Sequence, residues 1–368
     1  MNPEPGRRPE TPVVNVLMSV YNGEAHLPEA LDTLLSQTFR AFEMVVVDDG
    51  STDGSLRILQ EHAERDDRIR LLCNESNRGL SASLNRGLLL CRAPIVARAD
   101  ADDIYAPNYL ETQLRLLRDR PELGVVSSAF DKVDVDGNFL NSFRPPTEDA
   151  QIRAELLFSN CLTHSTTVFR AGLVRAAGGY DETFWTAQDY ELWSRLRDSA
   201  RFANSDVPLV RYRRHDGATT RRRGQAGERL SLTVTQRLLT KYLSRPLALD
   251  DICVVRKLYC GTEAPGIQAA RQGTSILRDV VGQAGRVEDR ATVTALRRRI
   301  CRSLFSLAVS SAPTDRQTSR HLLGQAARMD PDWTLDRRML KLRARLHLPE
   351  ALLAYARDAM KGRTVEER

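Results

Sequence analysis

Residues 94–103 read PIVARADADD, an apolar run that ends in three aspartates, Asp100, Asp102 and Asp103. Such a run is typical of a strand in a parallel sheet that is covered on both faces. Carboxylates this close together repel one another, and they are costly to hold beside low-dielectric protein. The stretch therefore predicts a buried strand whose carboxyl end attracts a positive partner.

Asp100 and Asp102 have the spacing of a metal-binding pair. Alternate side chains of an extended chain share a face, so both carboxylates point the same way. Hard oxygen ligands suit Mg²⁺ or Mn²⁺, which complete their shells with water and substrate phosphates. A divalent ion that bridges a diphosphate would explain the pair. The alternative is a capping role for the helix expected near Pro107, which fits Asp103 better than the other two.

Strand and helix patterns alternate on either side of this stretch. Apolar strands are expected at residues 13–20, 42–47, 69–73 and 94–99, and helices at residues 27–37, 56–64 and 80–91. The alternation predicts an α/β fold with a doubly wound, mostly parallel, Rossmann-like sheet. Ligands of such sheets bind at the carboxyl ends of the strands. Tyr21 with Asn22, Asp48 with Asp49, and Asp100 with Asp102 each follow a strand, so one cleft can use all three segments.

The remainder of the chain divides into more alternating elements and a helical region. Helices are expected at residues 107–119, 150–158, 171–177 and 188–198, strands at 124–130, 165–170 and 207–214, and a hairpin at 131–139. Asp189 falls in the first turn of the helix at 188–198. We expect a disordered tail at residues 1–11, a catalytic domain at 12–217, a linker at 218–230 and an all-α region at 231–368.

Charge is divided unevenly along the 368 residues. Residues 1–210 hold 22 Lys and Arg against 32 Asp and Glu, a net charge of −10, whereas residues 211–368 hold 32 against 16, a net charge of +16. An acidic half suits a metal site, and a basic helical half suits an anionic surface such as membrane headgroups. Solvated arginine faces without a partner are the alternative reading. With no signal peptide and no membrane-spanning run, we expect a cytoplasmic protein, with peripheral attachment to the inner face of the membrane as an option.

Five segments in register carry a resemblance to a known family: VVNVLMSVYNGEAHLPEAL, VVVDDGSTDGS, NRGLSASLNRGL, ARADADD and GGYDETFWTAQDYELWSRL. Over about residues 12–217 the chain resembles the family 2 glycosyltransferases. The resemblance implies a GT-A fold with a mixed sheet and transfer of a sugar, with inversion, from a nucleotide-diphosphate sugar to a saccharide or lipid-linked acceptor. Mn²⁺ or Mg²⁺ is the implied cofactor, and synthesis of surface polysaccharide or glycolipid is the implied process.

The resemblance also implies roles for individual positions. Asp189 matches the catalytic base, a role that suits a carboxylate kept ionised by the helix dipole. Asp102 matches the metal ligand, and His215 matches a position near the metal or diphosphate, although a lone surface histidine is equally consistent. The implied nucleotide-sugar contacts are Val20, Tyr21, Asn22, Glu24, Asp49, Arg78, Asp100 and Ala101.

The acceptor side is less defined. His164, Trp185 and Gln188 are the residues we expect there, although His164 can equally be structural and Trp185 can pack its own loop. Gln188 departs from the glutamate that usually precedes the base in this family, which removes a charge beside Asp189.

Two other functions remain open at this level. A nucleotidyltransferase that makes nucleotide sugars uses a similar sheet, but the segment SVYNGEAHL lacks its glycine-rich phosphate loop. A non-catalytic protein that binds nucleotide sugars or an anionic surface is the other alternative. No nucleic acid is expected as a partner, because the arginine clusters at 221–223 and 297–299 are not interleaved with aromatic residues.

Overall fold

The computed structural model describes residues 7–214, 224–330 and 346, which fall into two compact units divided between Val234 and Thr235. Residues 224–230, expected to be linker, instead form the first turns of helix α9 (Gly224–Leu243). Good helix formers such as Gln225, Ala226 and Arg229 outweigh two glycines there. His215, the rest of the expected linker and residues 1–6 of the expected tail lie outside the described residues.

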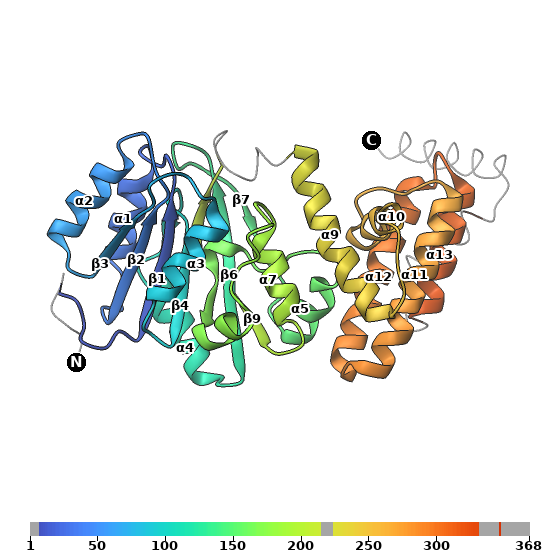
Figure 1. The fold of residues 1–368 in the computed structure, drawn as a ribbon. Coiled ribbons are helices and arrows are strands. Elements are labelled where there is room, and N and C mark those ends of the chain that lie inside the picture. Colours follow the sequence, from blue (N-terminus) through green and yellow to red (C-terminus); the bar gives the residue numbers. More distant parts are fainter. Residues whose placement is uncertain (1–6, 215–223, 331–345, 347–368) are drawn as a thin grey trace, which may run out of the picture. The chain divides into compact units, whose positions relative to one another are not determined.

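The first unit is built on one mixed sheet of nine strands (Figure 1). The strands are β1 (Val14–Val20), β2 (Phe42–Asp48), β3 (Ile69–Cys73), β4 (Ile95–Ala99), β5 (Ile104–Tyr105), β6 (Leu123–Val133), β7 (Phe139–Phe143), β8 (Val168–Arg170) and β9 (Arg201–Arg213). Their order is β3-β2-β1-β4-β8-β6-β9-β5, and β7 pairs with β6. The α/β fold predicted from the sequence is confirmed.

Helices connect these strands and pack along the sheet. They are α1 (Leu27–Leu35), α2 (Ser55–Arg65), α3 (Leu80–Leu90), α4 (Tyr109–Asp119), α5 (Asp149–Leu156), α6 (Ala171–Ala176) and α7 (Gln188–Leu196), with a 3₁₀ turn at His164–Thr166. The expected strand at 165–170 is shorter because this turn replaces its first half. The last expected strand is longer, since β9 begins at Arg201 and pairs with β6 along most of its length.

The parallel half of the sheet aligns the ends of three strands. β1 pairs in parallel with β2 and β4, in a register that places Val20 beside Asp48 and Met18 beside Ala99. Every residue of β2 is buried, as expected for a strand with both faces covered. The loops after β1, β2 and β4 therefore leave the sheet at one edge.

The other half of the sheet contains antiparallel pairs. β8 is antiparallel to both β4 and β6, and β5 is antiparallel to β9. The pairing of Ile104 with Arg211 brings the end of β9 to the aspartate loop. There the backbone N–H of Arg213 donates to Asp103 Oδ1 over 3.0 Å, and its Nε donates to the carbonyl of Asp102 over 3.1 Å. These pairings link the aspartates to strand β6, to which β9 runs parallel.

The second unit is helical. After α9 it contains α10 (Leu249–Cys260), α11 (Ile267–Val287), α12 (Arg290–Ser311) and α13 (Arg316–Met329). Its core consists of residues such as Leu277, Val280, Leu296, Ile300 and Leu322, all at most 1% exposed. Among the described residues, we find no helix long and apolar enough to span a membrane.

Candidate active site

A cavity of about 290 Å³ opens where β4, β6, β9 and α7 meet. It is lined by Leu80, Arg98, Asp100, Asp102, Phe130, Lys132, Asn160, Thr163, His164, Ser165, Gln188, Asp189 and Tyr212. Asp102 and Asp189, separated by 87 positions in the chain, thus face the same space. The fold therefore places the carboxylate of Asp189 in the same cavity as the aspartates that follow β4.

The acidic cluster consists of Asp100, Asp102 and Asp103. Each offers one carboxylate oxygen, and these oxygens lie within 4.8 Å of one another. Burial raises the pKa of Asp103 well above its usual value, and the Asp102 and Asp100 charges add to this effect. Three hard oxygen donors at this spacing fit Mg²⁺ or Mn²⁺, which neutralises such a cluster. The residues present therefore suit a divalent cation.

Arg98 supplies a buried positive charge beside this cluster. Its Nη2 donates to Asp100 Oδ1 over 2.5 Å, and its side chain is only 1% exposed. Burial raises the pKa of Asp100, as do the charges of Asp102 and Asp189, while Arg98 opposes the shift. Nε and Nη1 of Arg98 make no hydrogen bond within the described residues. Asp100 is therefore held by the protein itself, through the buried charge of Arg98.

Asp189 lies in the first turn of α7. The preceding Ala187 has φ of +57°, in the left-handed region that residues other than glycine rarely adopt. This turn starts the helix with Gln188 and Asp189 at the cavity. Asn160 Nδ2 donates to Asp189 Oδ2 over 2.8 Å. Strained backbone of this kind concentrates at functional sites, where the surrounding structure maintains it.

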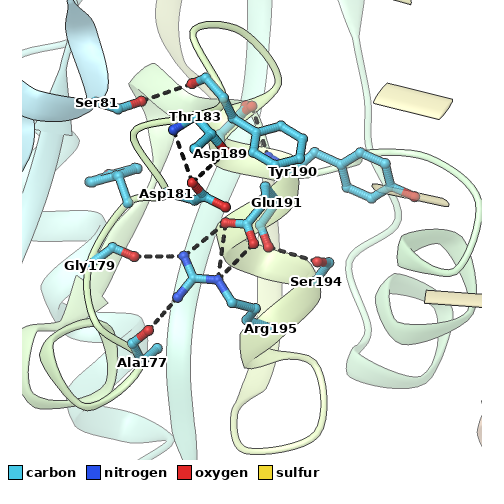
Figure 2. A network of polar contacts seen from close by, with 12 residues as sticks. Ser81, Ala177, Gly179, Asp181, Thr183, Asp189, Tyr190, Glu191, Ser194 and Arg195 are labelled. Atoms are coloured by element: carbon cyan, nitrogen blue, oxygen red, sulfur yellow. Dashed lines mark hydrogen bonds and ion pairs between the residues drawn. The ribbon is translucent and has the colours of Figure 1, made fainter. Parts of the chain in front are cut away.

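A polar network holds the start of α7 in place (Figure 2). Arg195 donates to Glu191 at 2.8–3.0 Å and to the Gly179 carbonyl at 2.6 Å, and it also bonds to Ala177. Ser81 on α3 donates to the carbonyl of Phe184 over 3.0 Å. The loop before α7 is thus fixed both to its own helix and to α3, which defines the position of Asp189.

The loop after β1 is tied to the loop after β2. Asn22 has φ of +52°, and its Oδ1 accepts a hydrogen bond from Thr52 N over 2.8 Å. Glu24 Oε2 accepts from Gly54 N over 2.9 Å. Tyr21 is 46% exposed, whereas Val20 is buried at the end of β1. A Cβ built on Gly23 would lie 3.7 Å from the Cβ of Ala101, so this loop also contacts the aspartate loop.

Asp49 accepts hydrogen bonds from a third loop, residues 74–79, which contains Arg78. Its Oδ1 accepts hydrogen bonds from Asn74 Nδ2 at 2.7 Å and from Arg78 N at 2.9 Å. Its Oδ2 accepts from Gly79 N at 2.9 Å. Asp49 is only 2% exposed, and three of its hydrogen bonds come from the protein. The expected contact to a nucleotide base is thus limited to the remaining acceptor capacity of this carboxylate.

The residues expected on the acceptor side differ in their surroundings. His164 is 8% exposed, lines the cavity and lies 2.9 Å from the Tyr180 hydroxyl through its Nε2. Gln188 is buried and also lines the cavity. Trp185 is 50% exposed and is not among the residues that line the cavity. His164 and Gln188 therefore line the same cavity as Asp189, whereas Trp185 does not.

Sequence reasoning missed several residues that line the cavity, among them Arg98, Lys132, Asn160 and Tyr212. Lys132 on β6 pairs with Tyr212 on β9, so the two come from strands far apart in the chain. One feature of the sequence could have pointed to Arg98, because it is a charged residue inside an otherwise apolar strand. No feature of the sequence pointed to Asn160, because this residue reaches the cavity through a hydrogen bond to Asp189, 29 positions away.

Comparison with known proteins agrees with this fold. The family model described as glycosyl transferase family 2 matches residues 15–176. The amylovoran biosynthesis glycosyltransferase AmsE of Erwinia amylovora is 32% identical over 213 residues, 57% of this chain and 79% of that protein. The O-antigen biosynthesis glycosyltransferase WbnJ of Escherichia coli is 28% identical over 211 residues, 56% of this chain and 82% of that protein.

Among solved structures, residues 1–349 of S. aureus TarS in complex with UDP-GlcNAc align with a TM-score of 0.55. The alignment covers 86% of this chain and 91% of that one at 18% sequence identity, a level that shows a shared fold. The class defined by fold and sequence is a sugar-transferring enzyme with the GT-A fold. This chain belongs to glycosyltransferase family 2.

Proposed function

We propose that the protein is an inverting glycosyltransferase that moves a sugar from a nucleotide-diphosphate donor to a hydroxyl of a saccharide or lipid-linked acceptor. The observation that carries the proposal is the lining of one cavity by Asp102, Asp189 and Lys132. This cavity combines a metal-binding carboxylate, a proton acceptor and a cation. The relatives named for amylovoran and O-antigen biosynthesis support surface polysaccharide or glycolipid synthesis as the process.

In this mechanism Asp189 accepts the proton of the acceptor hydroxyl while that oxygen attacks the anomeric carbon. The new glycosidic bond forms as the bond from the anomeric carbon to the diphosphate oxygen breaks, and the nucleoside diphosphate leaves. Attack opposite the leaving group inverts the configuration. Asn160 holds the carboxylate of Asp189 in place through its hydrogen bond of 2.8 Å.

Negative charge develops on the departing diphosphate. Asp102, with Asp100 and Asp103, would hold Mn²⁺ or Mg²⁺, which when bound supplies positive charge to the diphosphate. Lys132 lines the same cavity and pairs with no carboxylate among the described residues, so its charge is available to the phosphates. Tyr21, Asn22, Glu24 and Arg78 would form the nucleotide side, and His164 and Gln188 the acceptor side. His215 stays a prediction as a metal or diphosphate contact.

The test is incubation with a panel of nucleotide sugars plus Mn²⁺ or Mg²⁺, with released nucleoside diphosphate as the readout. No acceptor is needed for this test, because slow transfer of the sugar to water also releases nucleoside diphosphate, and the donor that releases most is the preferred one. Asp189→Asn should abolish release and keep donor binding, because the amide cannot take the proton. Asp206→Asn is the matched control, since Asp206 is an exposed residue on β9 that does not line the cavity. Normal turnover by the Asp189 variant would refute the assignment of the base.

A further inference from the structure

The helical unit contains a second cavity, of about 740 Å³, formed by the end of α11, by α12 and by the residue after α13. It is lined by Gly285, Glu288, Arg290, Val293, Thr294, Arg297, Arg298, Arg302 and Asp330. Four arginines from one helix thus face one hollow. None of the residues expected in sugar transfer belongs to it.

The spacing of the four arginines along α12 explains why they lie on the same side of the helix. Arg297, Arg298 and Arg302 lie seven, eight and twelve positions after Arg290, which corresponds to about two to three turns of a helix. Leu296 and Ile300 point to the opposite side and are fully buried in the unit. Helix α12 therefore has an apolar side packed in the core and an arginine side that lines the cavity.

The four arginines have no ion-pair partner within the described part of the chain. Elsewhere in the same unit cations do pair, as in Arg245 with Asp279 at 2.6 Å and Lys257 with Glu263 at 2.7 Å. The cavity contains two carboxylates, and Glu288 already accepts a hydrogen bond from the Tyr242 hydroxyl over 3.3 Å. Positive charge exceeds negative charge around this hollow.

Clustered guanidinium groups repel one another unless an anion lies between them. The planar fork of arginine matches the oxygens of a phosphate group, and such charge-assisted hydrogen bonds are among the strongest in proteins. A volume of about 740 Å³ is that of a small-molecule site and exceeds the needs of a single phosphate. We propose that this cavity binds a diphosphate or a ligand with several phosphate groups, at a site separate from the one that transfers the sugar.

The first experiment uses sodium pyrophosphate as the probe and the full chain as the protein. Calorimetric titration is done in EDTA, because the acidic cavity of the first unit repels pyrophosphate without a divalent ion. Wild-type protein should bind, and its affinity should fall as salt is raised. Arg297→Gln with Arg298→Gln should weaken binding by roughly tenfold or more, since it removes two charge-assisted contacts.

A matched control is Arg271→Gln with Arg278→Gln on α11. Both residues are exposed, neither lines the cavity, and the pair removes the same charge. We expect its pyrophosphate affinity to stay within about twofold of wild type, because non-specific attraction depends only weakly on two distant surface charges. Arg290→Gln with Arg302→Gln is a second cavity pair, which should weaken binding as the first pair does. Circular dichroism of each variant confirms that the helices are retained.

A second arm separates the two sources of phosphate. Co-sedimentation with vesicles that contain cardiolipin, a lipid with two phosphate groups, compared with vesicles of phosphatidylcholine alone, tests a lipid headgroup as the ligand. Vesicle binding that is lost in the cavity variants and kept in the α11 control assigns the phosphate to a lipid. Pyrophosphate binding without vesicle binding assigns it to a soluble phosphate ester. Absence of both, or an equal loss in the cavity and control variants, overturns the proposal.

Discussion

Asn160 donates a hydrogen bond of 2.8 Å to Oδ2 of Asp189, across 29 positions of sequence. Asn160 follows α5, and Asp189 lies in the first turn of α7, so the bond joins two separately placed segments at the cavity. The other carboxylate oxygen, Oδ1, accepts a hydrogen bond of 2.9 Å from the backbone N–H of Tyr190, so both oxygens of Asp189 are held in place. Asn160 is therefore a positioning residue for the proposed base.

Asn160→Ala should lower kcat by roughly tenfold or more, because a misplaced catalytic group loses much of its effective concentration. The KM for the donor should change by less than about threefold, since Asn160 acts through Asp189. Steady-state kinetics with the preferred nucleotide sugar checks this split. Asn108→Ala is the control, as Asn108 is exposed and its side chain caps no helix. A rise in KM with unchanged kcat would contradict the positioning role.

Asp102→Ala should remove most of the metal-dependent gain in donor binding, because it deletes one of the three clustered carboxylates that we propose as the cation site. Titration of a nucleoside diphosphate with and without Mn²⁺ measures that gain. In EDTA the variant should bind the nucleotide as wild type does or slightly better, since a repelling charge is gone. Asp67→Ala, at an exposed position outside the cluster, should retain the full metal effect.

Arg98→Met should destabilise the first unit by about 3 kcal/mol, because it leaves the Asp100 carboxylate without its buried partner. Asp100→Ala should also destabilise it, by leaving the guanidinium unpaired. The double variant should lose less than the sum of the single losses, because neither charge is then left alone. Urea unfolding of all four proteins gives the comparison, and additive losses would show that the pair contributes no coupling.

Glu43 gives a prediction for the dependence of stability on pH. Burial alone would raise its pKa, but hydrogen bonds from Asn15 and Arg92 and the charge of Arg8 lower the pKa below its ordinary value of 4.5. A lowered pKa in the folded state stabilises the fold above the unfolded pKa, and this contribution is lost as the pH falls through the folded pKa.

Glu43→Gln should therefore lower the free energy of unfolding by about 1–3 kcal/mol at pH 7. The difference from wild type should shrink below about pH 4, where the carboxylate becomes protonated. Chemical unfolding at a series of pH values measures this effect. Glu64→Gln, at an exposed site on α2, should show little difference at any pH. A constant penalty for Glu43→Gln across the series would assign the loss to shape and not to charge.

Local patterns predicted the parallel half of the sheet because its strands are short, apolar and followed by polar turns. The position of Asp100, Asp102 and Asp189 at one site followed from the rule that strand ends share an edge and from the family resemblance. The roles of Lys132 and Tyr212 could not be predicted, because they depend on the pairing of β6 with β9. Pairings between distant strands leave no periodic signal in either strand alone.

The same limit applies to the boundary of the helical region. Residues 224–230 contain two glycines and two charged residues, a composition that is typical of a linker, yet they form the start of α9. Intrinsic propensity is a weak guide where a longer helix can extend. Likewise, the sequence showed arginine clusters, but only helical phase and the packing of α12 decide which arginines face the cavity.

The hydrogen bonds of Asp49 have a consequence for how nucleotide preference would evolve. This carboxylate fastens Asn74, Arg78 and Gly79 to the end of β2. The adjoining Gly50 has φ of +71°, and a Cβ there would meet the Ser76 backbone at 2.6 Å. A substitution at Gly50 would therefore move the segment around Ser76 relative to β2, so the shape of the proposed nucleotide side can change while Asp49 itself stays the same.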